Sequence, residues 1–123
     1  MILLDTNALL FLLHRHPRAR RLERYKEKLA VSPFSVLELA FLAEVGRARM
    51  KVRDPVQAVS EDGRWTYDSA PLDAVVAAAM SLNWTHDPFD RLICGHALSR
   101  QWRLATADTL ILEKLPPSAT LEL

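Results

Sequence analysis

The stretch Met1-Ile2-Leu3-Leu4-Asp5-Thr6-Asn7 opens the chain and decides its fold class. A run of apolar residues this short is typical of a strand that is buried on both faces, and Asp5 closes it. Apolar residues at helical spacing follow from Ala8 to Leu13. A buried strand that passes directly into a helix is the first unit expected of a parallel α/β fold.

The rest of the chain repeats this alternation. Further strands are expected at residues 29–31, 65–67, 103–105 and near 120–121. Helices are expected at residues 18–28, 34–47, from 54, 71–83, 87–101 and from 107. This pattern predicts a three-layer α/β/α sandwich with a central parallel sheet. Because the 123 residues contain no repeat or linker, we expect one domain over residues 1–123.

Four carboxylates stand where such a fold could bring them together. They follow or interrupt apolar segments, and they are Asp5, Glu38, Asp90 and Asp108. Burying several ionised carboxylates together is costly unless a cation or hydrogen bonds compensate them. Hard divalent cations prefer oxygen ligands of this kind. The pattern therefore predicts a Mg²⁺ or Mn²⁺ site that supports a reaction at phosphate, with Thr6, Asn7 and Thr106 as polar neighbours.

Glu38 is the most informative of the four. Between residues 34 and 43 the only polar side chains are Ser35 and Glu38, so the helix is apolar nearly all round and is expected to be buried centrally. A surface Glu normally lies on a polar face, which this helix almost lacks. We interpret Glu38 as a carboxylate directed into a polar pocket, although the rim of a helix that just reaches water would also accommodate it.

Each acid, taken singly, also has a structural explanation. Asp5 suits the N-cap of the first helix, and Asp108 suits the first turn of a helix capped by Thr106. Asp87 precedes Pro88, a combination typical of an N-cap followed by proline at the first helical position. Asp90 aligns with the inward stripe of the same helix, so we assign capping to Asp87 and the pocket to Asp90.

The charges are distributed unevenly along the chain. Residues 1–53 contain 11 Lys or Arg and 5 Asp or Glu, whereas residues 54–123 contain 5 and 10. A basic half that faces an acidic half suits a polyanion held near a cation site, although solvated helix faces would give the same pattern. The candidate nucleic-acid-binding residues are Arg15, Arg18, Arg20, Arg47, Arg49 and Arg91.

Other classes of site are excluded by composition. Three glycines, at positions 46, 63 and 95, cannot form a phosphate-cradling loop or a dinucleotide fingerprint. Cys94 is the only cysteine, which rules out an intramolecular disulfide and favours a cytoplasmic protein. The opening apolar run is too short for a signal peptide, and the longest one, residues 74–80, is too short for a membrane span.

Four motifs together resemble a known family. They are residues 1–10 around Asp5-Thr6-Asn7, Ser35-Val-Leu-Glu38-Leu, His86-Asp-Pro-Phe-Asp90-Arg-Leu, and Leu104-Ala-Thr106-Ala-Asp108. The chain resembles PIN-domain ribonucleases, specifically the VapC-type toxins of prokaryotic type II toxin–antitoxin pairs. The resemblance spans essentially the whole chain. The Asp-Pro-Phe-Asp-Arg string is its most specific part.

The resemblance implies a PIN-like α/β/α sandwich, commonly a homodimer. It also implies Mg²⁺- or Mn²⁺-dependent endonucleolytic cleavage of RNA and a cognate antitoxin protein. The family's acidic ligands carry over to Asp5, Glu38, Asp90 and Asp108, and its polar residue near the last acid to Thr106. Two alternatives remain at this point: a catalytically inactive module of the same fold that binds nucleic acid or protein, and a small phosphatase that uses Asp5 as nucleophile.

Overall fold

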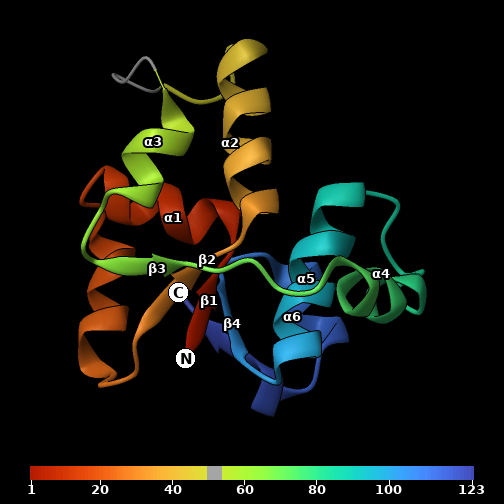
Figure 1. Ribbon diagram of the computed structural model, residues 1–123. Helices are drawn as coiled ribbons and strands as arrows, with labels where there is room; N and C mark the ends of the chain where they lie inside the picture. Colours follow the sequence, from red (N-terminus) through yellow and green to blue (C-terminus); the bar gives the residue numbers. More distant parts are fainter. Residues whose placement is uncertain (50–53) are drawn as a thin grey trace.

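The computed structural model describes residues 1–49 and 54–123, and in this part of the chain five strands form a parallel sheet (Figure 1). The strands are β1 (Ile2–Leu4), β2 (Leu29–Val31), β3 (Trp65–Tyr67), β4 (Arg103–Thr106) and β5 (Thr120–Glu122). Their order across the sheet is β3-β2-β1-β4-β5, and every neighbouring pair is parallel. The predicted parallel sheet is confirmed.

Helices cover both faces of this sheet. The α-helices are α1 (Thr6–Leu13), α2 (Pro33–Glu44), α3 (Pro55–Ser60), α4 (Leu72–Met80), α5 (Pro88–Arg100) and α6 (Thr109–Lys114). Two 3₁₀ segments, η1 (Pro17–Arg24) and η2 (Pro117–Ala119), complete the described elements. Figure 1 shows α1, α2 and α3 on one side of the sheet and α4, α5 and α6 on the other, which is the three-layer sandwich expected from the sequence.

The side-chain alternation of β1 divides the core into two clusters. Ile2 and Leu4 pack with residues of α1 and α2, whereas Leu3 packs with residues of α5 and α6. All three side chains are fully buried, as are Ala30 in β2 and Leu104 in β4. A strand buried on both faces has no polar position, which explains the uninterrupted apolar run of β1.

Two expectations about helices are wrong. The charged stretch predicted as a helix over residues 18–28 is the shorter 3₁₀ segment η1, in which Ala19 and Leu22 are the buried residues. Two anchors three residues apart match the three-residue repeat of a 3₁₀ turn. The α2 helix is not buried all round, because Leu37, Phe41 and Val45 are 59%, 43% and 50% exposed. Figure 1 shows that α2 extends well beyond the edge of the sheet, and there only Phe41 of these three side chains stacks on another described ring, that of Phe89 in α5, with centroids 5.9 Å apart.

The helices α4 and α5 approach each other closely at Gly95. A Cβ atom at this position would lie 2.7 Å from the Val75 carbonyl oxygen, so only glycine fits without displacing α4. Among the described residues, no helix is both long enough and apolar enough to cross a bilayer.

Candidate active site

Asp5 stands at the carboxyl end of β1, beside the carboxyl end of β4. Its backbone N–H donates to the Ala105 carbonyl at 3.1 Å, and its Oδ1 accepts from the Ala8 N–H at 2.7 Å, so it caps α1. The chain leaves β1 towards β2 on one side, while β4 and β5 lie on the other. Ligands of open α/β sheets bind at such a point, where the strand order reverses.

Asp5 is a strongly perturbed acid. Only 6% of the residue is exposed, and burial raises the pKa of its carboxyl to about 6. The Thr106 hydroxyl and the Ala8 N–H stabilise the ionised form, whereas the charges of Asp108 and Glu38 disfavour it. Asp108 and Glu38 therefore both lie within electrostatic reach of Asp5.

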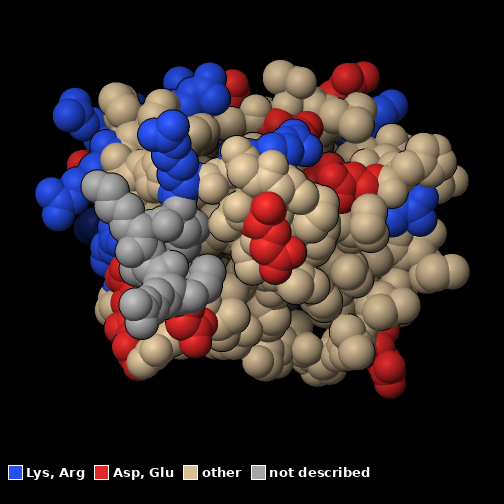
Figure 2. Space-filling model, turned by 90° about the horizontal axis from the view of Figure 1, so that it is seen from above, with Lys and Arg blue, Asp and Glu red and all other residues tan. Residues whose placement is uncertain are grey.

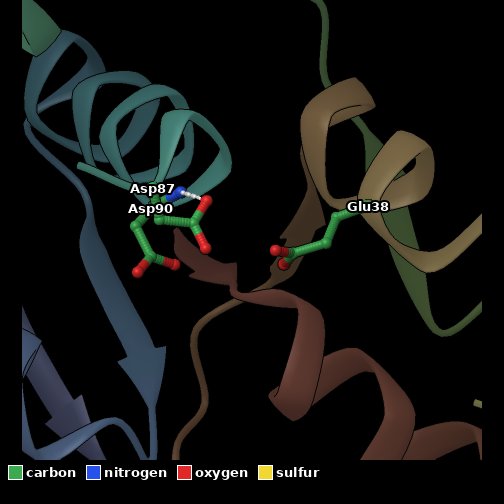
Figure 3. Close-up of side chains that lie close together, drawn as sticks. All are labelled: Glu38, Asp87 and Asp90. Atoms are coloured by element: carbon green, nitrogen blue, oxygen red, sulfur yellow. Dashed lines mark hydrogen bonds between the residues drawn. The ribbon is translucent and has the colours of Figure 1, made fainter. Parts of the chain in front are cut away.

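Three further carboxylates converge from α2 and from the start of α5. Ligand oxygens of Glu38, Asp87 and Asp90 all lie within 4.8 Å of one another, and Figure 3 shows the Glu38 side chain pointing across the gap towards the two aspartates. Burial, together with the charges of Asp87, Glu38, Asp108 and Asp5, raises the pKa of Asp90 to about 7. The charges of all four other acids therefore act on Asp90.

The presence of Asp87 in this group was not predicted. Its assignment as the N-cap of α5 is correct, since it accepts from the N–H groups of Phe89 at 2.8 Å and Asp90 at 3.3 Å. Both bonds end on Oδ1, however, and the other oxygen is left to face Glu38. The signal was available in the sequence: Asp87 precedes Asp90 by three residues, a spacing that puts two side chains on one helical face.

Asp108 is also a cap, which corrects the role expected for Thr106. The Asp108 Oδ1 accepts from the N–H groups of Leu110 at 2.8 Å and Ile111 at 3.1 Å, so Asp108 begins α6. Thr106 is instead the last, fully buried residue of β4, and its hydroxyl accepts from the Asp108 N–H at 3.0 Å. Thr106 thus contacts both Asp5 and Asp108, and it positions these two acids.

The acid cluster (Asp5, Glu38, Asp87, Asp90 and Asp108) has hydrogen-bond donors but no ion-pair partner among the described residues. None of the ion pairs formed by the described residues includes Asp5, Glu38, Asp87, Asp90 or Asp108. Burial and the charge of Asp87 raise the pKa of Glu38, whereas Thr6 and the charge of Arg47 act to lower it. Among the described residues, the Thr6 hydroxyl is the one buried side-chain polar atom without a hydrogen bond of normal geometry. Excess carboxylate together with an orphaned hydroxyl fits a hard divalent cation.

The remaining predicted site residues lie around this cluster. Asn7 is exposed in the first turn of α1, and Arg91 donates from Nε to the Thr85 carbonyl at 2.7 Å. The other predicted RNA-binding residues, Arg15, Arg18, Arg20, Arg47 and Arg49, are all exposed. Part of the basic run 47–53 lies outside the described residues. In Figure 2 the Lys and Arg side chains gather mainly on the side of α1 and η1.

A second polar cluster lies apart from the acids, and we call it the His96 network (Ser32, Asp68, His96 and Arg100). His96 is 1% exposed; its Nδ1 lies 2.8 Å from the Ser32 Oγ, and its Nε2 lies 2.7 Å from the Asp68 Oδ2. Arg100 holds both oxygens of Asp68 at 3.0 and 3.1 Å. Ser32 is fully buried and accepts from the Phe34 N–H, so it caps α2 and is not available to a substrate as a nucleophile.

Comparison with known proteins now fixes the family. A model of the PIN domain matches residues 2–115. The chain belongs to the PIN domain family. This PIN domain is 38% identical over 88 residues to Ribonuclease VapC22 of Mycobacterium tuberculosis, a match that covers 68% of this chain and 65% of the relative. The chain thus spans less than two thirds of the length of that relative.

Solved structures share the fold of this PIN domain. VapBC2 from Rickettsia felis, bound to a DNA fragment from its promoter, has a TM-score of 0.71 at 20% identity and covers 100% of this chain and 99% of that one. A toxin–antitoxin complex from Klebsiella pneumoniae also has a TM-score of 0.71, at 16% identity, with 100% of both chains covered. At these identities the likeness establishes the fold.

Proposed function

We propose that this PIN domain is a divalent-metal-dependent endoribonuclease and the toxin of a toxin–antitoxin pair. The observation that carries the proposal is the convergence of Glu38, Asp87 and Asp90 within 4.8 Å, with Asp5 and Asp108 in electrostatic reach. The relationship to a ribonuclease of the VapC type supports RNA as the substrate.

Glu38, Asp87 and Asp90 are the residues that would hold a Mg²⁺ or Mn²⁺ ion, with Asp5 and Asp108 beside them. When bound, such an ion supplies a Lewis acid that activates water and neutralises charge on phosphate oxygens. The ionised carboxylates are needed for binding, so acids with raised pKa values give up protons as the site fills. Asp5 and Asp90 are the two groups from which those protons would come.

The protein contributes orientation as well as charge. The Ala8 N–H and the Thr106 hydroxyl fix Asp5, while the first turns of α5 and α6 fix one oxygen each of Asp87 and Asp108. In both of these caps the hydrogen bonds end on Oδ1, so the second oxygen remains for the ion. Capping and metal binding are therefore compatible in the same side chain.

Loss of one acid tests this proposal. Wild-type protein, incubated with total RNA in Mg²⁺ or Mn²⁺, is expected to generate new 5′ ends that sequencing can map. Asp5→Asn should lower the cleavage rate by about 100-fold or more, because the change removes an ionised group beside the ion. Asp73→Asn makes the same chemical change on the exposed start of α4 and should leave cleavage intact. Cleavage that survives in Asp5→Asn, or in EDTA, contradicts the proposal.

Partner proteins belong to the same proposal. Solved relatives of the fold are complexes named VapBC. In this chain, apolar side chains at a spacing of four residues are exposed on α2 (Leu37, Phe41, Val45) and on α4 (Leu72, Val76, Met80). Exposed apolar stripes of this kind mark protein contacts. We infer a homodimer and an antitoxin, which light scattering and co-purification with the product of an adjacent short reading frame would test.

A further inference from the structure

A small cavity opens between α1 and the residues that follow α2. Its volume is about 300 Å³, at the small end of the range of ligand pockets and suited to one molecule of nucleotide size. Its wall includes Asn7, Phe11, His14 and His16 on one side and Arg47 and Arg49 on the other. No carboxylate is among these lining residues, which are all in the described part of the chain.

The wall combines flat rings with guanidinium groups. The Phe11 and His16 rings stack with centroids 4.6 Å apart, and the guanidinium of Arg18, which does not line the cavity itself, lies 5.8 Å from the Phe11 centroid. Aromatic rings with interleaved arginines are how proteins bind single-stranded nucleic acid, because the rings stack on bases and the arginines contact phosphates.

The cavity adjoins the acid cluster. Asn7 lies two residues beyond Asp5 in the first turn of α1, so one end of the cavity begins beside the acids. On the opposite wall, Arg47 follows α2, the helix that carries Glu38, and its backbone N–H donates to the Leu42 carbonyl at 2.8 Å, so this wall continues from the same helix. A strand of RNA cut at the acids would therefore have a neighbouring nucleotide at this position.

A larger cavity of about 510 Å³ adjoins the first one at His16, and it is a poorer site for a phosphate chain. Glu23 and Glu27 line it together with Arg15 and Arg20. Its third arginine, Arg64, is already paired with Asp62 at 2.7 Å. Carboxylates in the wall repel phosphate, so the smaller cavity is the better candidate.

We propose that the cavity between α1 and Arg47–Arg49 holds one nucleotide of single-stranded RNA next to the bond that is cut. The base packs against the rings of Phe11, His14 and His16, and the flanking phosphates contact Arg47 and Arg49. Base stacking is tolerant of sequence, so this site contributes affinity for unpaired RNA with little preference among the four bases. The inference rests on the proposed function, since it assigns the substrate's position relative to the acids.

Binding of two labelled probes separates the contribution of the base from that of the phosphates. The probes are an octamer of uridylate and a ribose-phosphate octamer without bases, measured by fluorescence anisotropy in EDTA with the full chain. Wild-type protein should bind the uridylate octamer at least about fivefold more tightly, as expected for one stacked base. His14→Ala should remove most of this difference in affinity between the two probes, and His14→Phe should restore it.

Substitution of an arginine should change the binding of the two probes in a different way. Arg49→Ala is expected to weaken both probes equally and to reduce the slope of log affinity against log salt by about 0.7, the value for one phosphate contact on a single strand. Lys114→Ala, which removes one positive charge from α6, should change neither the ratio nor the slope. Equal ratios in wild-type protein and His14→Ala, or no measurable binding of the uridylate octamer, would overturn the inference.

These outcomes remain distinct from failure of the proposed function. Because binding is measured without metal, a protein that shows the base-dependent ratio but does not cleave RNA retains the nucleotide site and loses the nuclease assignment. A protein that cleaves RNA with an unchanged ratio in His14→Ala retains the nuclease assignment and loses the nucleotide site.

Discussion

The acid cluster and the His96 network are both polar and at least partly buried, and both include residues of α2 and α5 or of their caps. In the two regions, however, the surroundings shift the pKa values of the carboxylates in opposite directions. In the network, burial raises the pKa of Asp68, but hydrogen bonds from His96 and Arg100 outweigh this effect and leave the pKa below its ordinary value. In the cluster, no such partner is present among the described ion pairs, and the pKa values of Asp5 and Asp90 rise to about 6 and about 7.

This difference separates buried polar groups that serve the fold from polar groups that are available for function. A buried polar group that serves the fold is paired with other protein groups, as His96 is with Ser32 and Asp68. A group of acids without cationic partners costs stability, and it persists where something outside the chain compensates it. The two regions should therefore respond in opposite ways to the same kind of change.

The largest expected effect is on the stability of the His96 network. His96→Ala removes a fully buried ring together with its hydrogen bonds to Ser32 and Asp68, and should lower the free energy of unfolding by about 2–4 kcal/mol. Asp90→Asn removes a charge that the folded state disfavours and should leave stability equal or higher at pH 8. Urea unfolding in EDTA measures both variants, and a comparable loss in Asp90→Asn would remove the contrast.

The pH dependence of stability should show the same opposition. Asp5 and Asp90 bind protons more tightly in the folded state, so without metal their contribution is favourable at about pH 5 and is lost as pH rises through about 6 and 7. Asp68, with a lowered pKa, contributes above its ordinary pKa of 3.8 and loses this contribution in more acidic solution.

Thermal melts between pH 5 and pH 8 in EDTA measure this decline. The double variant Asp5→Asn with Asp90→Asn should show a much flatter profile over this range, whereas His96→Ala should be shifted downwards but retain the slope. A wild-type melting temperature that rises steadily from pH 5 to pH 8 would mean that the acids are not crowded in the folded protein.

The smallest expected effect is stabilisation by metal. Mn²⁺ or Mg²⁺ at ten times its dissociation constant should add about 1.4 kcal/mol to the free energy of unfolding, a shift of several degrees in the melting temperature. Glu38→Gln should lose most of this shift, and Glu113→Gln, on the exposed side of α6, should keep it. Equal shifts in the two variants would indicate binding elsewhere.

Local sequence rules predicted the framework of the site well. The run Ile2–Leu4 followed by Asp5 correctly predicted a strand buried on both faces and the acid at its carboxyl end, because such a strand is apolar at every position. Asp54 and Asp87 were correctly predicted as caps, since an aspartate before proline satisfies the free N–H groups of a first turn. The acidic positions at strand ends followed from the parallel topology.

The predictions that failed concerned features that are set by tertiary position or by the role of one atom of a side chain. The exposure of Leu37 and Phe41 depends on how far α2 extends past the sheet, and sequence periodicity does not report that length. Asp87 was assigned to capping alone because the capping rule gives each residue a single role. Its cap hydrogen bonds, however, end on only one of its two carboxylate oxygens. Asp108 caps α6 in place of Thr106, because β4 runs one residue further than expected and includes Thr106.

The single cysteine has a practical consequence. Cys94 is fully buried in α5 beneath the acids, and burial, with the charges of Asp90, Asp5 and Asp108, raises its pKa to about 12. Alkylating reagents and oxidants attack the ionised sulfur, which is scarce and shielded here. A second cysteine introduced on the surface would therefore be the one that a maleimide dye modifies, and the native chain already serves as the background for fluorescent labelling.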